Sequence, residues 1–260
     1  MFTNNFDPVA FELFYISIRW YSLAYIFGII FGWIYCKKIL IKNATIQKLF
    51  DDYISYLIIG IIIGGRLGYV VFYNFPYYLK SPIEIFMIWN GGMSFHGGLI
   101  GTIISSYLFA KKNNQNIFIF LDLVSIVAPI GLFFGRIANF INTELIGRPT
   151  DFYISVIYPS IDNVPRHPSQ LYEAFFEGII LFLILILYFI KTKNLQNHGF
   201  ISALFLCLYS TFRFIIEFIR EPDSHLGIFF NFLTMGQILC IPLFLYGMFM
   251  IQHYVFRRKN

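Results

Sequence analysis

The sequence predicts an all-α membrane protein whose helices cross the bilayer several times. Hydrophobic residues make up 58% of the 260 positions, charged residues only 13%, and phenylalanine alone occurs 33 times. A soluble domain is about half apolar and about a quarter charged. The composition therefore excludes an ordinary water-soluble domain, and the bilayer is the environment expected for most of the chain.

Apolar runs define the expected helices, because about 18 or more apolar residues are needed to cross the hydrocarbon core. The clear runs cover residues 16–36, 53–73, 172–190, 198–219 and 233–252, and two weaker ones cover 95–110 and 117–135. We expect seven transmembrane helices in a single integral membrane domain, residues 1–260. The first run is expected to remain as a helix, because Asp7 and Glu12 stand where a signal peptide has basic residues.

The basic residues between the runs predict the orientation, since lysine and arginine gather in short cytoplasmic loops. Every second loop is basic, with Lys37, Lys38, Lys42, Lys48, Lys111, Lys112, Lys191, Lys193, Arg257, Arg258 and Lys259. The opposite side carries Lys80 and the arginines Arg19, Arg136, Arg148, Arg166 and Arg220. We therefore expect the N-terminus outside and the C-terminus in the cytoplasm. This topology accounts for most of the net charge of +5, so no nucleic-acid partner is inferred.

One long polar segment, residues 135–171, interrupts the alternation of span and short loop. Loops longer than about 12 to 15 residues are usually functional or disordered. Aromatic and β-branched residues between Phe152 and Tyr158 favour an ordered, strand-containing structure. We expect a small periplasmic-side head, inserted between the fourth and fifth helices and covering the active site.

The three cysteines give no sign of a disulfide framework or a metal site. Cys36, Cys207 and Cys240 lie in or at the end of apolar runs, without pairing spacing and without a nearby His or Asp cluster. We interpret them as small apolar packing residues. No metal ion is expected.

The segment from Gly91 to Gly101 places one imidazole, that of His96, among five glycines at the outer mouth of the third run. Glycines permit close backbone approach and unusual dihedral angles. They could serve tight helix packing, with His96 an interfacial histidine. Alternatively, His96 takes part in chemistry, which requires a partner acid, base or substrate.

Such partners are found in the segment from Gly135 to Arg148, which leaves the fourth run at the same face. If it is helical, Arg136, Asn139 and Thr143 share one side. Arginine binds phosphate through two parallel hydrogen bonds, so a phospholipid head group is the expected ligand at this depth. Interfacial arginines that merely extend to water are the alternative.

Three charged side chains lie inside expected spans, where an ionisable group costs about 2.5 to 3.5 kcal/mol and usually has a functional partner. Arg66 lies among glycines in the second run, and Arg213 is four residues before Glu217 in the sixth. We expect Glu217 to hold Arg213 in place, although a purely structural pair remains open. The segment from Arg166 to Glu173 is interpreted mainly as a helix start, with Glu173 in its first turn.

Together these segments resemble the bacterial prolipoprotein diacylglyceryl transferase family. The matching pieces are Arg19-Trp20-Tyr21 with Tyr25, Gly65-Arg66-Leu67-Gly68-Tyr69, His96-Gly97-Gly98, the signature from Arg136 to Arg148, the segment from Arg166 to Glu173, and the segment from Phe212 to Phe218. They occur in family order across nearly the whole chain, and six pieces in register are highly specific. Ala138 and Thr143 differ, since the family usually has glycine at both positions.

The resemblance implies an enzyme of the bacterial cytoplasmic (inner) membrane that moves the diacylglyceryl group of phosphatidylglycerol to the lipobox cysteine of preprolipoprotein signal peptides. The product is a thioether, and glycerol 1-phosphate is released, as the first step of lipoprotein maturation. No cofactor is implied. The family's essential positions fall on Tyr21, His96, Arg136, Asn139, Glu144, Gly147, Arg213 and Glu217, and the expected substrate-binding set adds Arg66, Gly97 and Gly98.

This chemistry explains why these types of residue are present, because alkylating a thiol requires a thiolate and a stabilised phosphate leaving group. We expect His96 to act as general base, with a role in binding as the rival interpretation. Arg136 and Arg213 are expected to hold the phosphate as charge develops on it. The residues expected to orient the head group are Tyr21, Asn139 and Glu144.

Two other classes of function are weighed against the transferase. A transporter or channel would spread polar groups along a path to the midplane, often in two repeated halves. Here the polar groups gather toward one face, and no repeat is present. A lipid-binding scaffold without activity would need the arginines but not His96 and its glycines.

Overall fold

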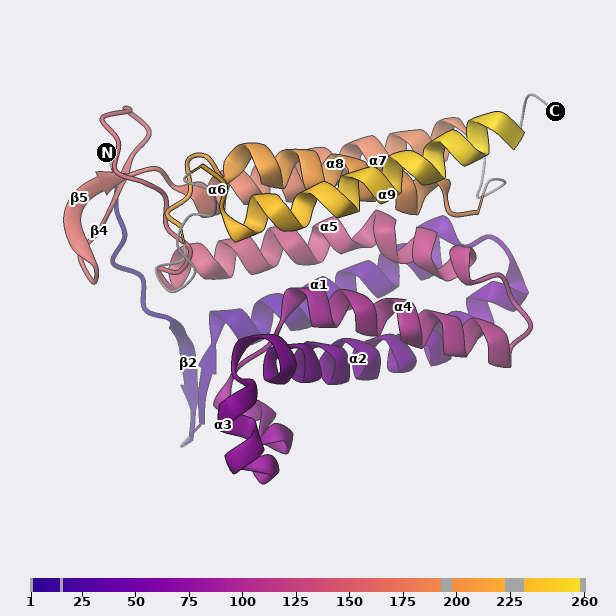
Figure 1. The fold of residues 1–260 in the computed structure, drawn as a ribbon, viewed down its shortest axis with the longest axis horizontal. Helices are drawn as coiled ribbons and strands as arrows, with labels where there is room; N and C mark the ends of the chain where they lie inside the picture. The colour runs from indigo at the N-terminus through magenta and orange to yellow at the C-terminus, as the bar shows by residue number, and fades with distance from the viewer. Residues whose placement is uncertain (1, 15, 193–197, 223–231, 258–260) are drawn as a thin grey trace. The chain divides into compact units, whose positions relative to one another are not determined.

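The structure is a computed structural model that describes all residues except 1, 15, 193–197, 223–231 and 258–260. The chain forms two compact units (Figure 1). The first unit comprises Met1–Tyr35 and Asp122–Asn260, and the second comprises Cys36–Leu121. Each unit is described by itself.

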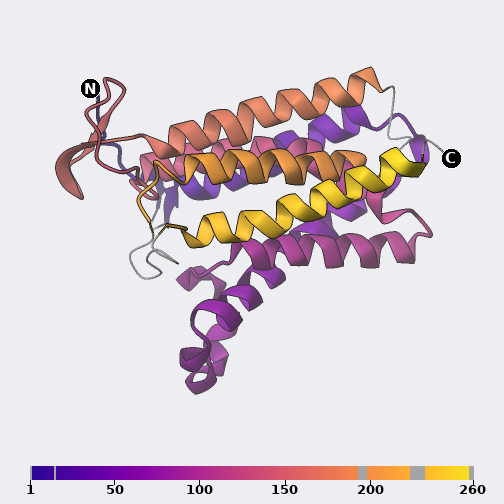
Figure 2. The ribbon, with the colours of Figure 1, turned by 45° about the horizontal axis from the view of Figure 1, so that its top comes forward.

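The first unit is mainly helical and carries two small sheets. Its helical segments are α1 (Trp20–Tyr35), most of α5 (Ile117–Ile141), α6 (Ser169–Glu173), the π-helix η4 (Ala174–Ile180), α7 (Leu181–Lys191), α8 (Phe200–Ile216) and α9 (Met235–Arg257). Figures 1 and 2 show α8 and α9 side by side. Helices α1 and α5 approach closely at two glycines, since a Cβ on Gly28 would lie 2.9 Å from the Cα of Gly131.

The strands of the first unit form a three-stranded and a two-stranded sheet. Strand β1 (Phe2–Thr3) pairs in parallel with β4 (Val156–Tyr158), and β4 pairs antiparallel with β5 (Asp162–Arg166). Strand β2 (Val9–Leu13) pairs antiparallel with β3 (Ile16–Arg19). The β4–β5 hairpin agrees with the strands expected in the polar segment 135–171.

The second unit is built on two long helices packed through glycines. Its elements are η1 (Cys36–Leu40), α2 (Ala44–Tyr73), α3 (Phe75–Lys80), η2 (Pro82–Phe86), η3 (Ile88–Asn90) and α4 (Phe95–Lys112). The side chain of Asn43 caps α2 by accepting hydrogen bonds from two backbone amides of its first turn. Along the interface of α2 and α4, Gly60, Gly64 and Gly68 face Gly97 and Gly101 so closely that no side chain would fit.

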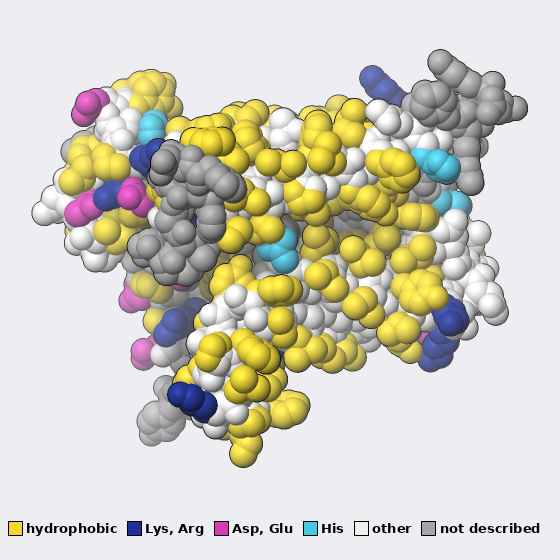
Figure 3. Space-filling view, viewed as in Figure 1, with side chains coloured by type: hydrophobic (Ala, Val, Ile, Leu, Met, Phe, Trp, Pro, Cys, Tyr) yellow, Lys and Arg dark blue, Asp and Glu magenta, His cyan; other side chains and the backbone are white. Residues whose placement is uncertain are grey.

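Five helical segments of the described chain are long and apolar enough to cross a membrane. They are Trp20–Leu40, Ala44–Tyr73, Ile117–Ile141, Ser169–Lys191 and Met235–His253, and α8 is a shorter apolar helix. Hydrophobic side chains dominate the helix surfaces in the space-filling view (Figure 3). The chain is therefore a mostly helical, multi-pass membrane protein, while the expected count of seven spans stays a prediction.

One expectation about secondary structure is wrong. The first helix begins at Trp20 instead of residue 16. Residues Ile16–Arg19 alternate apolar and polar side chains, which is the pattern of a half-exposed strand and not of a helix. The apolar run therefore combined a strand with the helix that follows it.

Candidate active site

Buried arginines and glutamates from three helical regions of the first unit form a connected cluster of ion pairs. Its members are Arg136 on α5, Glu173 on α6, Glu177 on η4, Arg213 on α8, and Glu217 and Arg220 just after α8. Among the described residues these side chains contribute equal numbers of positive and negative charges. Such burial is tolerated because each charge lies against an opposite one.

Glu173 is the centre of this ion-pair cluster. Its carboxylate forms an ion pair with Arg213, lies 3.1 Å from Nε of Arg136, and lies 3.9 Å from Nη1 of Arg220. The Arg136 contact is close, but its geometry is not that of a hydrogen bond. The expected helix start is confirmed, because α6 begins at Ser169 directly after Pro168. Glu173 does not lie in the first turn as expected, and its side chain is fully buried among guanidiniums.

Each of the other two carboxylates lies closest to one arginine. Glu217 Oε2 lies 2.7 Å from Nη2 of Arg213, four residues earlier on the same helix, as expected from their spacing. Glu177 Oε2 accepts a 3.1 Å hydrogen bond from Nη2 of Arg136. Glu177 belongs to a π-helical stretch, a local widening of the helix that is frequent at functional sites.

The end of α5 shapes the edge of the cluster. Asn139 donates a 2.8 Å hydrogen bond to Oε2 of Glu144. This bond holds the exposed side chain of Glu144 in one orientation. The expected shared helix face includes Arg136 and Asn139 but not Thr143, because α5 ends at Ile141. Thr143 has φ +58°, a left-handed conformation that costs a non-glycine residue about 1 kcal/mol or more. Glycine at this position would avoid this cost.

Gly147 lies where three chain segments meet. Its amide donates to the carbonyl of His167 over 3.1 Å, and the next amide, of Arg148, donates to the carbonyl of Ile219 over 2.8 Å. A Cβ on Gly147 would collide with the backbone of His167. Glycine is therefore required here by close packing, which joins the polar segment to the turn that carries Arg220.

Tyr21, the remaining predicted site residue of the first unit, lies on α1 together with Tyr25. The hydroxyl groups of Tyr21 and Tyr25 lie 3.3 Å apart, and their rings pack edge to face at 5.1 Å. Tyr25 lies within electrostatic range of Arg136 and Glu144. The structure therefore brings Tyr21, through Tyr25, to the same region as the residues at the end of α5.

The remaining predicted residues belong to the second unit. His96 is half-buried in the first turn of α4, whose N-terminus is capped by the hydroxyl of Ser94. Gly97 packs against the backbone of Gly64 and Gly68, whereas next to Gly98 the nearest atom to an added Cβ would be 3.8 Å away. At Gly97 the structure thus favours the packing interpretation of the glycine segment.

Arg66 is buried, and within the described part of the chain its hydrogen bonds all go to backbone carbonyls. Its guanidinium binds Ile85 O (2.9 Å), Glu84 O (2.5 Å), Met87 O (3.1 Å), Gly92 O (3.2 Å) and Gly91 O. These acceptors lie on the segment 84–92, which leads into α4. The contacts are those of a residue that shapes a loop, and substrate contact by Arg66 stays a prediction.

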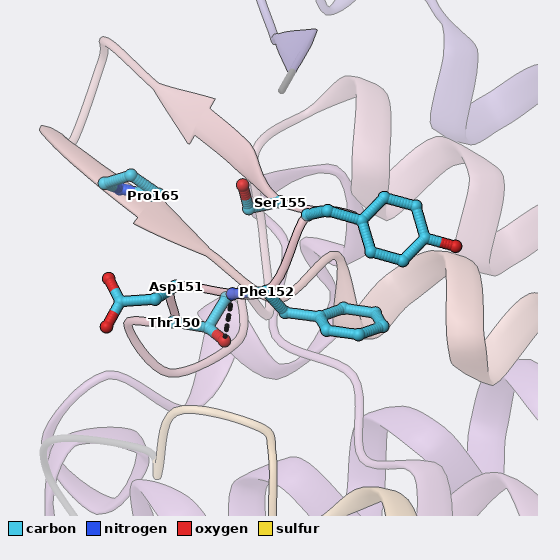
Figure 4. A pocket seen from close by; sticks show the side chains of 6 residues that line it. Thr150, Asp151, Phe152, Ser155 and Pro165 are labelled. Atoms are coloured by element: carbon cyan, nitrogen blue, oxygen red, sulfur yellow. Dashed lines mark hydrogen bonds between the residues drawn. The ribbon is translucent and has the colours of Figure 1, made fainter.

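A charged pair and a shallow pocket lie in the polar segment outside the cluster. Arg166 holds Asp162 at 2.6 Å, and this guanidinium lowers the pKa of the Asp162 carboxyl below its usual value. Figure 4 shows a nearby pocket of about 370 Å³ between the loop from Thr150 to Ser155 and Pro165. No residue predicted to be catalytic or substrate-binding lines it.

Sequence reasoning missed Glu177 and assigned Glu173 and Arg220 to peripheral roles. A signal was available, because Glu173 and Glu177 are four apart inside the apolar run 172–190. Ionisable groups inside a span usually face the bundle interior and have partners. The same argument that singled out Arg213 and Glu217 applies to them.

Comparison with known proteins matches nearly the whole chain. A sequence model of the family described as prolipoprotein diacylglyceryl transferase matches residues 8–253. A phosphatidylglycerol-prolipoprotein diacylglyceryl transferase of Rickettsia bellii is 52% identical over 250 residues, covering 95% of both chains. The proteins of that name from Rickettsia typhi and Rickettsia felis are 51% and 49% identical, over 96% and 95% of this chain and 98% and 96% of their own.

Proposed function

Because the chain belongs to the prolipoprotein diacylglyceryl transferase family, we propose that it transfers the diacylglyceryl group of phosphatidylglycerol to the lipobox cysteine of preprolipoproteins. The reaction forms a thioether, releases glycerol 1-phosphate and is the first step of lipoprotein maturation. One structural observation carries the proposal: a buried arginine cluster lies beside Tyr25, Asn139 and Glu144 at the end of α5. Guanidiniums suit a phosphodiester, and water-poor surroundings strengthen their effect on developing charge.

The membrane arrangement that suits this reaction is a seven-span protein of the bacterial cytoplasmic membrane. Helices α4 and α8 supply the two spans beyond the five longest helices; the 18 residues of α4 reach about 27 Å. The N-terminus lies outside and the C-terminus in the cytoplasm, as the lysine-rich loops indicate. The part of the polar segment 135–171 that follows Ile141, the last residue of α5, forms a head on the outer face of a single membrane domain, where lipoprotein precursors emerge.

Phosphate binding falls to Arg136 and Arg213. Their side chains are 14% and 11% exposed, so neither arginine is fully enclosed by the protein. The carboxylates around them fix the orientation of the guanidiniums before substrate arrives, which lowers the cost of ordering them. Glu217 keeps Arg213 in this orientation.

The thiol is alkylated by displacement at the glycerol carbon that carries the phosphate. The sulfur–carbon bond forms as the carbon–oxygen bond to phosphate breaks, and the leaving phosphate takes the electron pair. The proton of the thiol goes to His96, because imidazole is the side chain of the proposed set whose usual pKa lies near neutral pH. If His96 instead binds substrate, the pH profile of a His96→Gln variant will match that of the wild type.

The remaining residues position the groups that react. Tyr21, Asn139 and Glu144 orient the glycerol head group by hydrogen bonds. Gly147 keeps the polar segment joined to the turn after α8. Arg66, Gly97 and Gly98 complete the proposed substrate-binding set, acting at the N-terminus of α4 that carries His96.

The proposal is tested with purified full-length protein in detergent, phosphatidylglycerol labelled in its acyl chains, and a lipobox peptide. Wild type should attach label to the cysteine as a thioether. Arg136→Gln should lower turnover by about 100-fold or more, the usual cost of removing one group that stabilises developing negative charge. Lys37→Gln, which breaks the exposed pair with Asp51, is the control and should retain its rate.

Retained folding of Arg136→Gln is checked by its thermal midpoint, and Arg136→Lys offers a second variant that keeps the charge. If wild type binds phosphatidylglycerol but transfers nothing, the lipid-binding scaffold becomes the better account. If Arg136→Gln transfers at the wild-type rate, Arg136 does not hold the phosphate.

A further inference from the structure

The buried ion-pair cluster is balanced in charge before lipid binds. The three guanidiniums, of Arg136, Arg213 and Arg220, face three carboxylates, of Glu173, Glu177 and Glu217. A phosphodiester adds one negative charge to this set. Because an uncompensated buried charge is costly, a proton entering with the lipid would restore the balance.

Among the described residues, Glu177 is the carboxylate of the cluster that forms the fewest ion pairs. Glu173 forms ion pairs with three guanidiniums and Glu217 with two, whereas Glu177, within the residues that the structure describes, pairs with Arg136 alone. Glu177 Oε1 is buried without a hydrogen-bond partner in the described part of the chain, but the same holds for Glu173 Oε2, so the number of ion pairs is what distinguishes Glu177. A carboxylate with one paired cation is easier to protonate than one with two or three.

The groups around Glu177 also favour its protonation once a phosphate binds to Arg136. The charged or titratable groups that face it are Arg136 on α5, Glu173 on α6, Arg213 and Tyr209 on α8, and Cys240 on α9. A phosphate that forms an ion pair with Arg136 weakens the electrostatic attraction between Arg136 and Glu177, and this attraction is what keeps Glu177 ionised. It also adds a second negative neighbour beside Glu173, and a like charge favours the neutral form of a carboxyl group.

We propose that phosphatidylglycerol binding to this cluster takes up one proton from solvent and that Glu177 is the group that accepts it. The inference rests on the proposed function. In the free protein Glu177 is ionised and holds Arg136; in the complex Glu177 is a neutral carboxylic acid and the charge of Arg136 is balanced by the phosphate. The added negative charge and the added proton cancel, so the site stays neutral. Glu177 is therefore a positioning residue that acts through Arg136.

Proton uptake gives the affinity a defined pH dependence. At a pH where Glu177 is ionised in the free protein and protonated in the complex, the Kd for phosphatidylglycerol rises by up to about tenfold per pH unit. At lower pH Glu177 is protonated in both forms, and the Kd no longer changes. Gln is a neutral counterpart of the protonated side chain, so Glu177→Gln should bind lipid with a Kd that is flat in pH.

The test is calorimetric titration of the full-length protein in detergent with short-chain phosphatidylglycerol, in two buffers of different ionisation enthalpy. Wild type should take up about one proton per lipid at the pH where its affinity is steepest. Glu177→Gln should take up none while still binding. Glu221→Gln is the matched control, because Glu221 is an exposed carboxylate paired with Arg166 at 2.8 Å, and its uptake should equal that of wild type.

Wild-type binding without proton uptake overturns the inference, as does a Glu177→Gln variant that binds and still takes up one proton. Should the variant fail to fold, the wild-type proton count decides alone. Transfer to a lipobox peptide is measured on the same preparation. Transfer without uptake removes only the role of Glu177, whereas absence of both binding and transfer removes the proposed function as well.

Discussion

Adding one methyl group at Gly97 or at Gly98 separates the two interpretations of the glycine segment around His96. Both residues lie in the first turn and a half of α4. At Gly97 the new Cβ would lie 2.9 Å from Cα of Gly68 and collide with the carbonyl of Gly64, both rigid backbone of α2. At Gly98 the nearest atom is the Cγ2 of Ile61 at 3.8 Å, an ordinary contact distance.

The expected difference in stability between the two variants follows from the different space beside the two glycines. Replacing glycine by alanine inside a helix stabilises it by about 1 kcal/mol, and this gain is common to both variants. Overpacking against backbone costs about 1 to 3 kcal/mol, and only Gly97→Ala meets that cost. Gly97→Ala should therefore be about 1 to 3 kcal/mol less stable than Gly98→Ala, or lower in Tm by about 2 to 12 °C.

The assay is thermal unfolding of both variants in the same detergent, followed by transfer rates below both midpoints. Equal Tm values would refute the close packing of α2 and α4 at Gly97. A Gly98→Ala protein with wild-type Tm but reduced transfer would support substrate contact at Gly98. Wild-type transfer by Gly98→Ala would instead remove Gly98 from the substrate-binding set.

Three further changes test other parts of the structure. Arg66→Lys keeps the charge but has three donors for the five carbonyls that Arg66 binds in the segment 84–92, so hydrogen exchange there should accelerate; unchanged exchange with weaker lipid binding would point to substrate contact. Asp122→Asn removes a buried carboxylate that accepts from the amides of Gly199 (2.6 Å) and Ser202 (2.8 Å) at the start of α8. This substitution should lower the free energy of unfolding by about 1 to 2 kcal/mol, measured by thermal unfolding, and an unchanged midpoint would contradict the role of Asp122 as a cap of α8. Arg166 lowers the pKa of Asp162, so this pair stabilises the β4–β5 hairpin at neutral pH, and protection of the hairpin from hydrogen exchange should fall as acidification protonates Asp162. Asp162→Asn should abolish that acid-dependent change, and its persistence would assign the effect elsewhere.

Several features of the site follow from residue type and spacing alone. Arg213 and Glu217 are four apart on one helix, so their pairing follows from helix geometry, and the structure places them 2.7 Å apart. Arg136 and Asn139 likewise lie on the last turns of α5. The cost of burying ionisable groups in apolar runs was sufficient to select Arg66, Arg213 and Glu217. It applied equally to Glu173 and Glu177.

The sequence by itself determined that this chain is a multi-pass membrane protein, because apolar length and charge distribution are properties of the linear chain. Local spacing determined pairs within one helix. Only the tertiary structure decided which charges meet across helices, since the contacts of Glu173 with Arg136 and Arg213 join residues about forty positions apart. It also distinguished Gly97 from Gly98, because the space beside a glycine depends on the neighbouring helix and not on the glycine's own sequence.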